Sequence, residues 1–503
     1  MVYSPTERPI FQVRKETMET GKNAEKKLEI EKGLEDHLVK PTSYVQAQLL
    51  FCILFKKVFD KYFLTLEKPG FTRLGLLKGP GGVIYDATRI TSKDQVASSD
   101  PTLLHIVKSS MGAGVLAMPY AFKNAGLILG VVASAVTGLA ITHAMITLVN
   151  CAQKLGGKFN KSQMSYADTA EYAFIHGYQG KLKKFAYIAR GFVNFFLFLT
   201  IYGVITYYVL LISSTFKQVI ERYTNTDHDI RLFTLSIIFI VYPAGIVSQL
   251  RHLVPFSAVA NAVLLFSLGL IFCEIFRDLP PFSSRPLIEN PAQWPIFLGT
   301  SFVSMEGIGT ILPLENEMKN PTHLTHSPGL LYIGMLFSVL INTLIGFFGY
   351  LKYGPETRGV ISLNLPGDWI SESLKITVAL VVLFTYGLQM TAPMNVAWDG
   401  IRPMIKKNNL LYYYGLRSLL ILGNVLIAAA IPSLGGIISL MGSMGFSVIG
   451  FFVPAFIDLI CLSKDEHGFM KWRVFKNIIM ILFSIVCAGI GIYCSILEMK
   501  KES

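Results

Sequence analysis

A succession of long apolar segments, from residue 101 almost to the end of the chain, limits what this sequence can fold into. About 20 apolar residues in a helix cross the hydrocarbon core of a bilayer, and lipid admits only helices or closed barrels. Because no segment alternates with period two between regular turns, we expect helices. The predicted spans, good to a few residues, are 103–122, 127–151, 185–216, 231–249, 254–276, 293–313, 329–350, 371–393, 411–431, 434–460 and 475–496.

This pattern predicts an all-α integral membrane protein with about eleven transmembrane helices. The composition agrees, since only 16% of the residues are charged, against about 25% in soluble chains. The net charge of +12 therefore indicates topology and not nucleic-acid binding, because Lys and Arg gather in cytosolic loops. Basic residues cluster after the second, eighth and tenth predicted spans. We expect the N-terminus in the cytosol and a short C-terminal tail, 497–503, outside or in a lumen.

The first hundred residues differ from the rest of the chain. Residues 1–100 are mostly polar and mixed in charge, which is typical of a largely disordered cytosolic tail. The segment 44–66 within them is apolar but carries Lys56, Lys57 and Asp60. An amphipathic surface helix is one interpretation of that segment, and its role stays open. The membrane domain is expected over 101–496.

The first predicted span is a poor continuous helix. Ser109, Ser110, Gly112 and Gly114 lie near its middle, and such residues loosen a helix. The sixth span carries glycines near its middle too, beside the acid Glu306. A break in lipid is tolerated only where protein or a water-filled cavity surrounds it, and two broken spans in corresponding halves of a chain point to the binding site of a secondary transporter.

The separation of the two broken spans by five helices predicts two five-helix halves of inverted topology, followed by one extra helix. At the first break, the free N–H groups near Gly114 suit a carboxylate. At the second, free carbonyls near Met305 suit an ammonium group, so the pair favours a zwitterion. The alternative is that the glycines only allow close helix packing. The candidate substrate-binding residues are Ser109, Ser110, Met111, Gly112, Ala113, Gly114, Ser304, Glu306, Gly307 and Gly309.

Two ionisable side chains inside the spans are candidates for proton coupling. His105 precedes the first break, and the reference pKa of histidine, near 6.5, allows small shifts to move it across working pH; a neutral His bonded to a helix carbonyl is the alternative. Glu306 could carry a proton, contact the amine or cap a half-helix. The sequence has no phosphate-binding loop, metal-ligand cluster or nucleophile elbow. We therefore expect no enzyme, no metal and no cofactor, with an ion gradient driving any uptake.

The segments HIVKSSMGAGVLAMPYAFKNAG (105–126) and SMEGIGTILPLENEMKNP (304–321) resemble the amino acid/auxin permease family, and more narrowly its proton-assisted amino acid transporter branch. Residues 385–398 and 431–458 are similar to that branch as well, and the resemblance covers about 101–495. It implies ten helices in the leucine-transporter arrangement plus one more, and symport of glycine, alanine or proline with a proton. It also implies that His105 is tied to proton coupling.

The chain departs from that branch in two respects, since it lacks the cysteines of a common outer-loop disulfide and carries the unusual segment 44–66. Members of the branch occur at the plasma membrane or on lysosomes, so both membranes are candidates, with growth-signalling partners at the lysosome. The sequence thus predicts a proton-coupled symporter of small neutral amino acids that works by alternating access in a lipid bilayer. A sodium-coupled transporter and an amino acid sensor with little flux are the alternatives.

Overall fold

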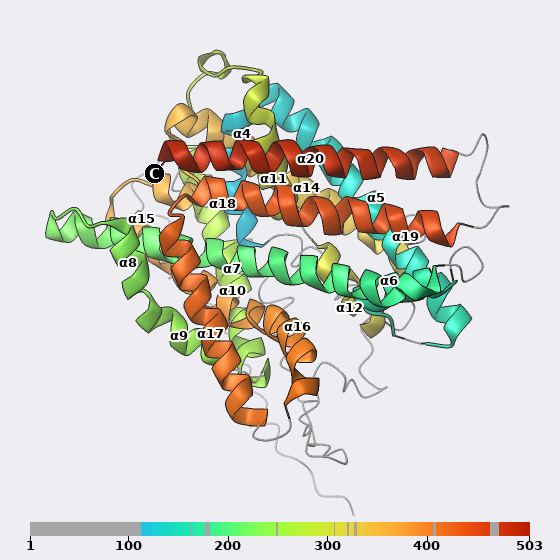
Figure 1. The fold of residues 1–503 in the computed structure, drawn as a ribbon. Coiled ribbons are helices and arrows are strands. Elements are labelled where there is room, and N and C mark those ends of the chain that lie inside the picture. The colour runs from blue at the N-terminus through green and yellow to red at the C-terminus, as the bar shows by residue number, and fades with distance from the viewer. Residues whose placement is uncertain are drawn as a thin grey trace, which may run out of the picture. The chain divides into compact units, whose positions relative to one another are not determined.

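The computed structural model describes residues 112–502, apart from gaps at 162, 177–181, 248–249, 306, 319–320, 326–328, 406–408 and 463–471 (Figure 1). All of them lie in the unit Phe71–Ser503. Several predictions lie outside the described residues and are not tested. They concern the tail 1–100, the segment 44–66 and the residues His105, Ser109, Ser110, Met111 and Glu306.

Every regular element of the described part is helical. In chain order the elements are η3 (Ala113–Ala117), α4 (Met118–Ala125), α5 (Leu127–Phe159), α6 (Tyr166–His176), η5 (Lys183–Phe185), α7 (Ala186–Thr224), α8 (Ile230–Ser236), α9 (Ile238–Ile246), α10 (Leu250–Ile275), η6 (Phe282–Ser284), η7 (Pro291–Gln293), α11 (Trp294–Ser304), α12 (Ile308–Glu317), α13 (Thr322–Thr325), α14 (Leu330–Tyr353), η8 (Gly354–Glu356), η9 (Ile361–Asn364), α15 (Trp369–Gln389), α16 (Thr391–Ile401), η10 (Arg402–Met404), α17 (Asn409–Ala430), α18 (Leu434–Met441), the π-helices η11 (Gly442–Phe446) and η12 (Val448–Phe452), α19 (Val453–Cys461) and α20 (Trp472–Glu502).

The predicted spans are found in the structure within a few residues. Among the described residues, 8 helical segments are long and apolar enough to cross a membrane, and the shorter apolar helices Ile230–Ile246 and Ala262–Ile275 match two further predicted spans. The pair η3 and α4 supplies the described part of the first span. The all-α fold class is therefore confirmed. The helix α20 continues to Glu502 and so includes most of the predicted C-terminal tail.

Apolar side chains occur both inside the bundle and on its surface, as lipid requires. Helix α4 packs against α14 and α11, and α11 packs in turn against α18, so a small group of helices forms the centre. On the periphery, large apolar side chains remain open, among them Leu139 on α5, Phe239 on α9 and Leu336 on α14, exposed to 68%, 83% and 70%. A soluble protein seldom leaves large apolar patches open to water, whereas a bilayer covers exposed apolar side chains.

The segment after the second predicted span, between α5 and α6, lies at one end of the bundle, and the segment between α7 and α8 lies at the other (Figure 1). One end holds α6, the end of α19 and the start of α20, and we call it the predicted inner end. The other holds the end of α7, the start of α15 and the C-terminal part of α20, and we call it the predicted outer end. This separation agrees with the predicted alternation of the spans.

A buried cation joins one helix from the first half of the described bundle to one from the second half. Arg417 of α17 is completely buried, and its Nε and Nη2 donate to the carbonyls of Gly245 (2.6 Å) and Val247 (2.8 Å). These carbonyls lie at the end of α9, whose Pro243 already disrupts the helix. Carbonyls at a helix C-terminus lack partners within the helix, so the guanidinium supplies their donors.

We predict that Arg417→Leu lowers the free energy of unfolding by about 2 kcal/mol, because the buried carbonyl of Gly245 and the half-buried carbonyl of Val247 lose their donors. The unfolding midpoint of the purified protein in detergent measures the effect. Arg231→Leu, at an exposed position of α8, is the matched control and should change the midpoint little. Equal midpoints for the two variants would show that Arg417 does not carry this role.

Candidate functional site

The two broken spans meet directly in the structure. The backbone N–H groups at the start of η3 follow Gly112, and α11 ends at Ser304 before α12 begins at Ile308. The buried hydroxyl of Ser304 lies within hydrogen-bond distance of the carbonyl of Gly114 (2.7 Å) and of that of Thr300 in its own helix (2.9 Å), and its single proton can be donated to either. The hydrogen bond to Gly114 spans 190 residues of sequence. The structure thus brings the two candidate segments together, although their role in substrate binding stays a prediction.

The approach of the two backbones depends on the absence of a side chain at Gly114. A Cβ built on this residue would lie 2.8 Å from Ser304 Cα and 3.1 Å from the Val303 carbonyl oxygen. Atoms of that kind cannot move aside without moving a helix. Gly112 differs, because nothing among the described residues lies within 4 Å of its added Cβ. Position 114 therefore has room only for glycine, whereas the described residues leave room for a side chain at position 112.

The remaining predicted residues of the two breaks occupy distinct places. Ala113 is buried in the first turn of η3. Gly307 is buried at the interruption between α11 and α12, whereas Gly309 lies inside the first turn of α12 and not at the break. The glycine pair therefore marks the start of the second half-helix more than the interruption itself.

The tenth span forms a wall of this site that the sequence analysis did not assign. A Cβ on Gly442 of η11 would fall 1.7 Å from the Gly299 carbonyl oxygen of α11, and one on Gly299 would fall 2.3 Å from the Ser439 carbonyl oxygen of α18. The backbone here is a π-helix, a form that often occurs at functional sites. The signal was present as the small-residue run SLGGIISLMGSMG, which is typical of close helix approach in membranes.

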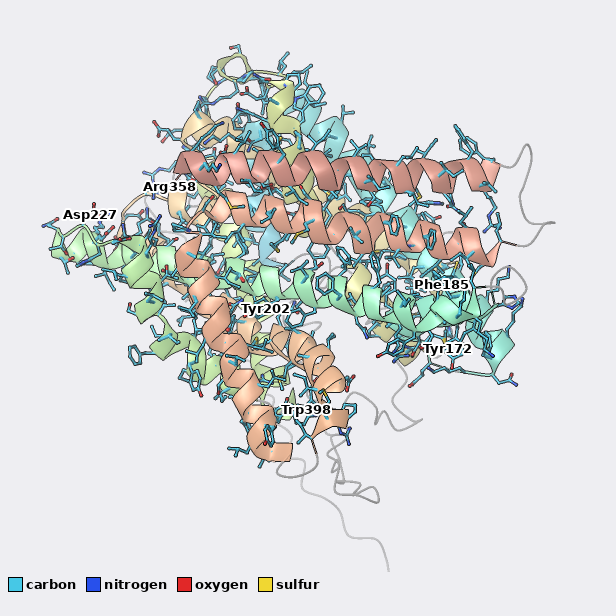
Figure 2. The ribbon with its side chains drawn as sticks, viewed as in Figure 1. Tyr172, Phe185, Tyr202, Asp227, Arg358 and Trp398 are labelled. Atoms are coloured by element: carbon cyan, nitrogen blue, oxygen red, sulfur yellow. The ribbon has the colours of Figure 1, made fainter. Side chains whose placement is uncertain are left out.

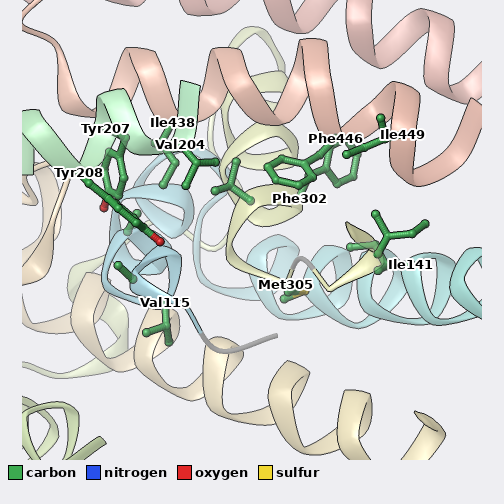
Figure 3. Packing of buried hydrophobic residues seen from close by; sticks show 14 of the residues in the cluster. Val115, Ile141, Val204, Tyr207, Tyr208, Phe302, Met305, Ile438, Phe446 and Ile449 are labelled. Carbon is green, nitrogen blue, oxygen red and sulfur yellow. The ribbon is translucent and has the colours of Figure 1, made fainter. Parts of the chain in front are cut away.

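Helix α7 contributes two aromatic residues near the first break. Figure 3 shows Tyr207 and Tyr208 of α7 on the side of the buried cluster where Val115 of η3 and Ile438 of α18 lie. Tyr207 is 1% exposed, and its hydroxyl has no hydrogen-bond partner among the described residues. A buried hydroxyl without a partner costs free energy, so this group is available to a polar ligand. Spacing along α7 gave no reason to single it out.

The predicted outer end is closed over the broken spans by direct contacts. Lys123 of α4 donates to the carbonyl of Thr357 (3.2 Å), and the Tyr120 hydroxyl donates to Glu498 Oε1 of α20 (3.1 Å). A Cβ on Gly359 would lie 2.8 Å from the Gly435 nitrogen at the start of α18. Helices α4, α18 and α20 and the loop after α14 therefore pack together above the site.

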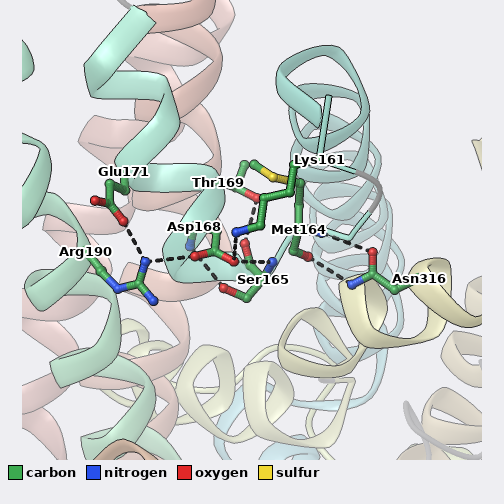
Figure 4. A network of polar contacts seen from close by, with 8 residues as sticks. All are labelled: Lys161, Met164, Ser165, Asp168, Thr169, Glu171, Arg190 and Asn316. Atoms are coloured by element: carbon green, nitrogen blue, oxygen red, sulfur yellow. Dashed lines mark hydrogen bonds and ion pairs between the residues drawn. The ribbon is translucent and has the colours of Figure 1, made fainter. Parts of the chain in front are cut away.

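The predicted inner end holds α12 with a pair of hydrogen bonds. The amide of Asn316 accepts from the Met164 N–H (3.2 Å) and donates to the Met164 carbonyl (3.0 Å) (Figure 4). Gln153 of α5 makes a further contact with α12, because its side-chain amide donates to the buried carboxylate of Glu315 (3.1 Å). The inner half of the sixth span is thus tied to α5 and to the segment that leads into α6.

An ion cluster beside this contact orders α6. Asp168 pairs with Lys161 (2.9 Å) and Arg190 (2.8 Å), and Arg190 also binds Glu171 (2.6 Å) (Figure 4). Burial by itself raises the pKa of Asp168, but the hydrogen bonds from Lys161 and Ser165 outweigh it and lower that pKa from 3.8 to about 2. The carboxylate therefore stays charged at any physiological pH.

The family model for "Transmembrane amino acid transporter protein" matches residues 96–497. The chain belongs to this family. The predicted family is confirmed, and the transporter is related to amino acid transporters and not to enzymes.

Two relatives illustrate the similarity. The transporter is 34% identical over 418 residues to "Proton-coupled amino acid transporter-like protein pathetic" of Drosophila melanogaster, which covers 83% of this chain and 88% of that protein. It is 26% identical over 442 residues to "Amino acid transporter AVT3C" of Arabidopsis thaliana, with coverage of 84% and 96%. A solved structure of MhsT in complex with L-phenylalanine aligns with 79% of this chain and 100% of that one, at 14% identity and a TM-score of 0.44. That score is too low to establish a common fold.

We predict that Gly114→Ala lowers the free energy of unfolding by about 1–3 kcal/mol, because the new methyl group forces two packed backbones apart. Gly112→Ala is the matched control, since its Cβ meets open space among the described residues and its backbone is extended at φ −71° and ψ −172°. The unfolding midpoints of both variants in detergent test the prediction. A stable Gly114→Ala protein would mean that the two breaks do not pack as described.

The lowered pKa of Asp168 predicts a specific pH dependence. A carboxylate whose pKa falls on folding stabilises the fold above its ordinary pKa of 3.8, and loses that effect as pH falls towards about 2. Stability should therefore decline across this window by about 2 kcal/mol in the wild type. Asp168→Asn should be less stable at neutral pH and should show a shallower decline, whereas Asp399→Asn, at an exposed position of α16, should follow the wild type. Unfolding midpoints measured from neutral pH to about pH 2.5 test this. If the cluster has no such role, the midpoints of the wild type and of Asp168→Asn will decline in parallel.

Proposed function

We propose that the transporter is a proton-coupled symporter of small neutral amino acids of the glycine, alanine and proline type. Membership of the amino acid transporter family gives the cargo class, and a relative that is named proton-coupled supports the choice of ion. The observation that carries the proposal is the contact between Gly114 and Ser304, because it places two interrupted helices side by side where a zwitterion can meet both.

In this proposal the substrate carboxylate lies against the N–H groups at the start of η3, at Ala113 and Gly114. The first N–H groups of a helix have no partner within it and attract anions. The substrate amine lies against the last carbonyls of α11, near Ser304 and Met305, where a helix end has spare acceptors. The tight packing of α11 against η3 and α18 supports a small side chain. Ser109, Ser110, Met111, Glu306, Gly307 and Gly309 remain proposed members of the same site.

The proton is proposed to bind at His105, with Glu306 as a second candidate. His105 precedes the first break by two turns of sequence, so its charge would be felt at the half-helix that binds the carboxylate. If proton and substrate both favour one conformation, each raises the affinity of the other, which is what coupling requires.

Alternating access is supported by the contrast between the two ends. The predicted outer end is closed by contacts among α4, α18, α20 and the loop after α14. The predicted inner end is held by other contacts, through Asn316 to Met164 and through Gln153 of α5 to Glu315. Opening towards the inner side would break the contacts of α12 with α5 and with the segment before α6, and would leave those of the outer end in place.

We further propose that the N-terminus is cytosolic and that the membrane is the plasma membrane or that of lysosomes or late endosomes. The basic residues at the predicted inner end, such as Lys154 and Lys158 near the end of α5 and Lys161 after it, support the orientation because such residues gather on the cytosolic side. In a lysosome the lumen replaces the outside, and amino acids would enter the cytosol with the proton, where growth-signalling partners could respond to them.

The test is uptake of radiolabelled alanine and the accompanying current, at about pH 5.5 and about pH 7.5, with and without sodium. We expect inward current and uptake several-fold higher at the acid pH and independent of sodium, with His105→Ala abolishing the acid stimulation. His228→Ala, on an exposed loop at the predicted outer end, is the control and should keep it.

Other results of this test favour the alternatives. Uptake that needs sodium and ignores pH would replace the proton by sodium and leave the amino acid site in place. A protein that reaches the surface and moves none of the amino acids tested would contradict the symporter and favour a sensor. Deletion of residues 1–100 would then abolish the sensor's output, while a transporter should keep its flux.

A further inference from the structure

A polar hollow lies at the predicted outer end, away from the two broken helices. It has two adjoining parts of about 380 Å³ and about 350 Å³, which share Gln218 and Glu221. The end of α7 forms one wall, residues 358–367 form another, and the start of α15 closes it. Figure 2 shows Asp227 and Arg358 close to this end of the bundle. The other lining residues that carry polar side chains are Ser214, Lys217, Arg222, Glu372 and Lys375.

The acidic groups of this hollow already have cationic or hydroxyl partners. Glu372 is buried, with one oxygen 3.0 Å from Arg222 Nε and the other accepting from the Tyr223 hydroxyl (2.5 Å). Glu221 pairs with Lys217 at 3.0 Å. Each acid of the lining therefore has a basic partner on α7, and Lys217 is shared with Asp227, which lies outside the lining, at 3.3 Å.

Lys375 is the cation that remains. Its side chain is only 4% exposed, it lines the larger part of the hollow, and no hydrogen bond or ion pair joins it to any residue of the described chain. An ammonium group inside a membrane-spanning helix is costly unless it is paired or faces a water-filled cavity. Glu372 stands three residues earlier, on the same face of α15, and its two oxygens face Arg222 and the Tyr223 hydroxyl. Glu372 attracts the Lys375 ammonium group electrostatically but forms no ion pair with it.

Arg358 adds to this surplus of positive charge. It is exposed at the mouth of the smaller part, and its side chain has no acidic partner within the described residues. A cavity that holds one buried ammonium and one exposed guanidinium, with its acids paired, attracts anions. The volume of the hollow admits a small ion or a short carboxylate, and the hollow is too open to bind a large anion selectively.

We propose that this hollow is a binding site for a small monovalent anion, a halide or a short carboxylate, anchored by Lys375. The position gives the site a structural consequence. Gln218 of α7 already donates to the Leu363 carbonyl (3.1 Å), and the loop that contains Leu363 packs through Thr357 and Gly359 on α4 and α18. An anion held between α7, this loop and α15 would therefore stabilise the closed outer end.

The experiment uses the full chain in lipid nanodiscs and measures the unfolding midpoint at constant ionic strength. Sodium chloride and sodium acetate are the two probes, and sodium gluconate, whose bulkier anion carries several hydroxyl groups that would lose water on entering the hollow, is the reference salt. We expect a saturable rise of about 2 °C in at least one probe relative to gluconate. A rise in chloride alone identifies a halide site, and a rise in acetate identifies a site for carboxylates.

Two variants locate the effect. Lys375→Met should lose the anion-dependent rise, while Lys352→Met should keep it, because Lys352 also lies at the predicted outer end but bonds to the carbonyls of Arg277 and Asp278. Lys375→Arg should keep part of the rise, since the charge remains. If Lys375→Met does not fold, bromide soaked into crystals of the wild type decides the matter by its anomalous signal at hydrogen-bond distance from Lys375 Nζ.

The proposal is overturned by equal midpoints in all three salts, by a rise that survives in Lys375→Met, or by bromide density elsewhere only. Any of these would mean that water alone solvates Lys375. The site does not depend on the transported substrate, because the assay needs neither a gradient nor an amino acid. Failure of the anion site and failure of proton-coupled uptake are therefore separate results.

Discussion

The structure depends on how backbone polar groups find partners where the surrounding medium offers none. A continuous helix solves this problem within itself, and the transporter departs from that solution at both broken spans. The departures are tolerated because each break is covered by the other: the Ser304 hydroxyl serves the carbonyl of Gly114, and the missing side chain at Gly114 brings the two backbones within contact. The rest of the bundle covers this crossing with protein, since α14 packs against α4 and α18 packs against α11. Arg417 solves the same problem elsewhere, at the end of α9.

The sequence predicted the fold well because the bilayer imposes a strong pattern. Each apolar segment of the necessary length became a helix or a pair of half-helices, and the interruption after Ser304 fell where Gly307 indicated. The contact between the two breaks was inferable as well, since glycines and serines clustered within a span favour an interruption that another segment of protein must cover. The position of Gly309 was predicted less well, because the sequence does not distinguish a glycine in the first turn of a helix from a glycine at an interruption.

The parts of the site that come from other spans could not be predicted in this way. Tyr207 is one aromatic residue among many in α7, and only packing shows that its hydroxyl lacks a partner among the described residues. The pairing of Asn316 with Met164 joins a side chain to a backbone 152 residues away, and no local pattern specifies such a partner. Lys375 stood near a span end, where long side chains usually reach water. Its burial is a property of the loop and of α7 that enclose it.

The π-helical turns of the tenth span give one segment two different orientations. A π turn takes up one residue more than an α turn, so side chains beyond it are rotated about 100° from where an α-helix would place them. Before the turns, α18 presents Ser439 and its neighbours to α11; after them, α19 presents Asp458 to Cys151 of α5 and to Asn477 of α20. The extra residues therefore rotate the second half of the span about its helix axis relative to the first half. Loss of a single residue from Gly442–Phe452 would leave the span long enough to cross the membrane, yet it would turn one half away from the neighbour that it serves.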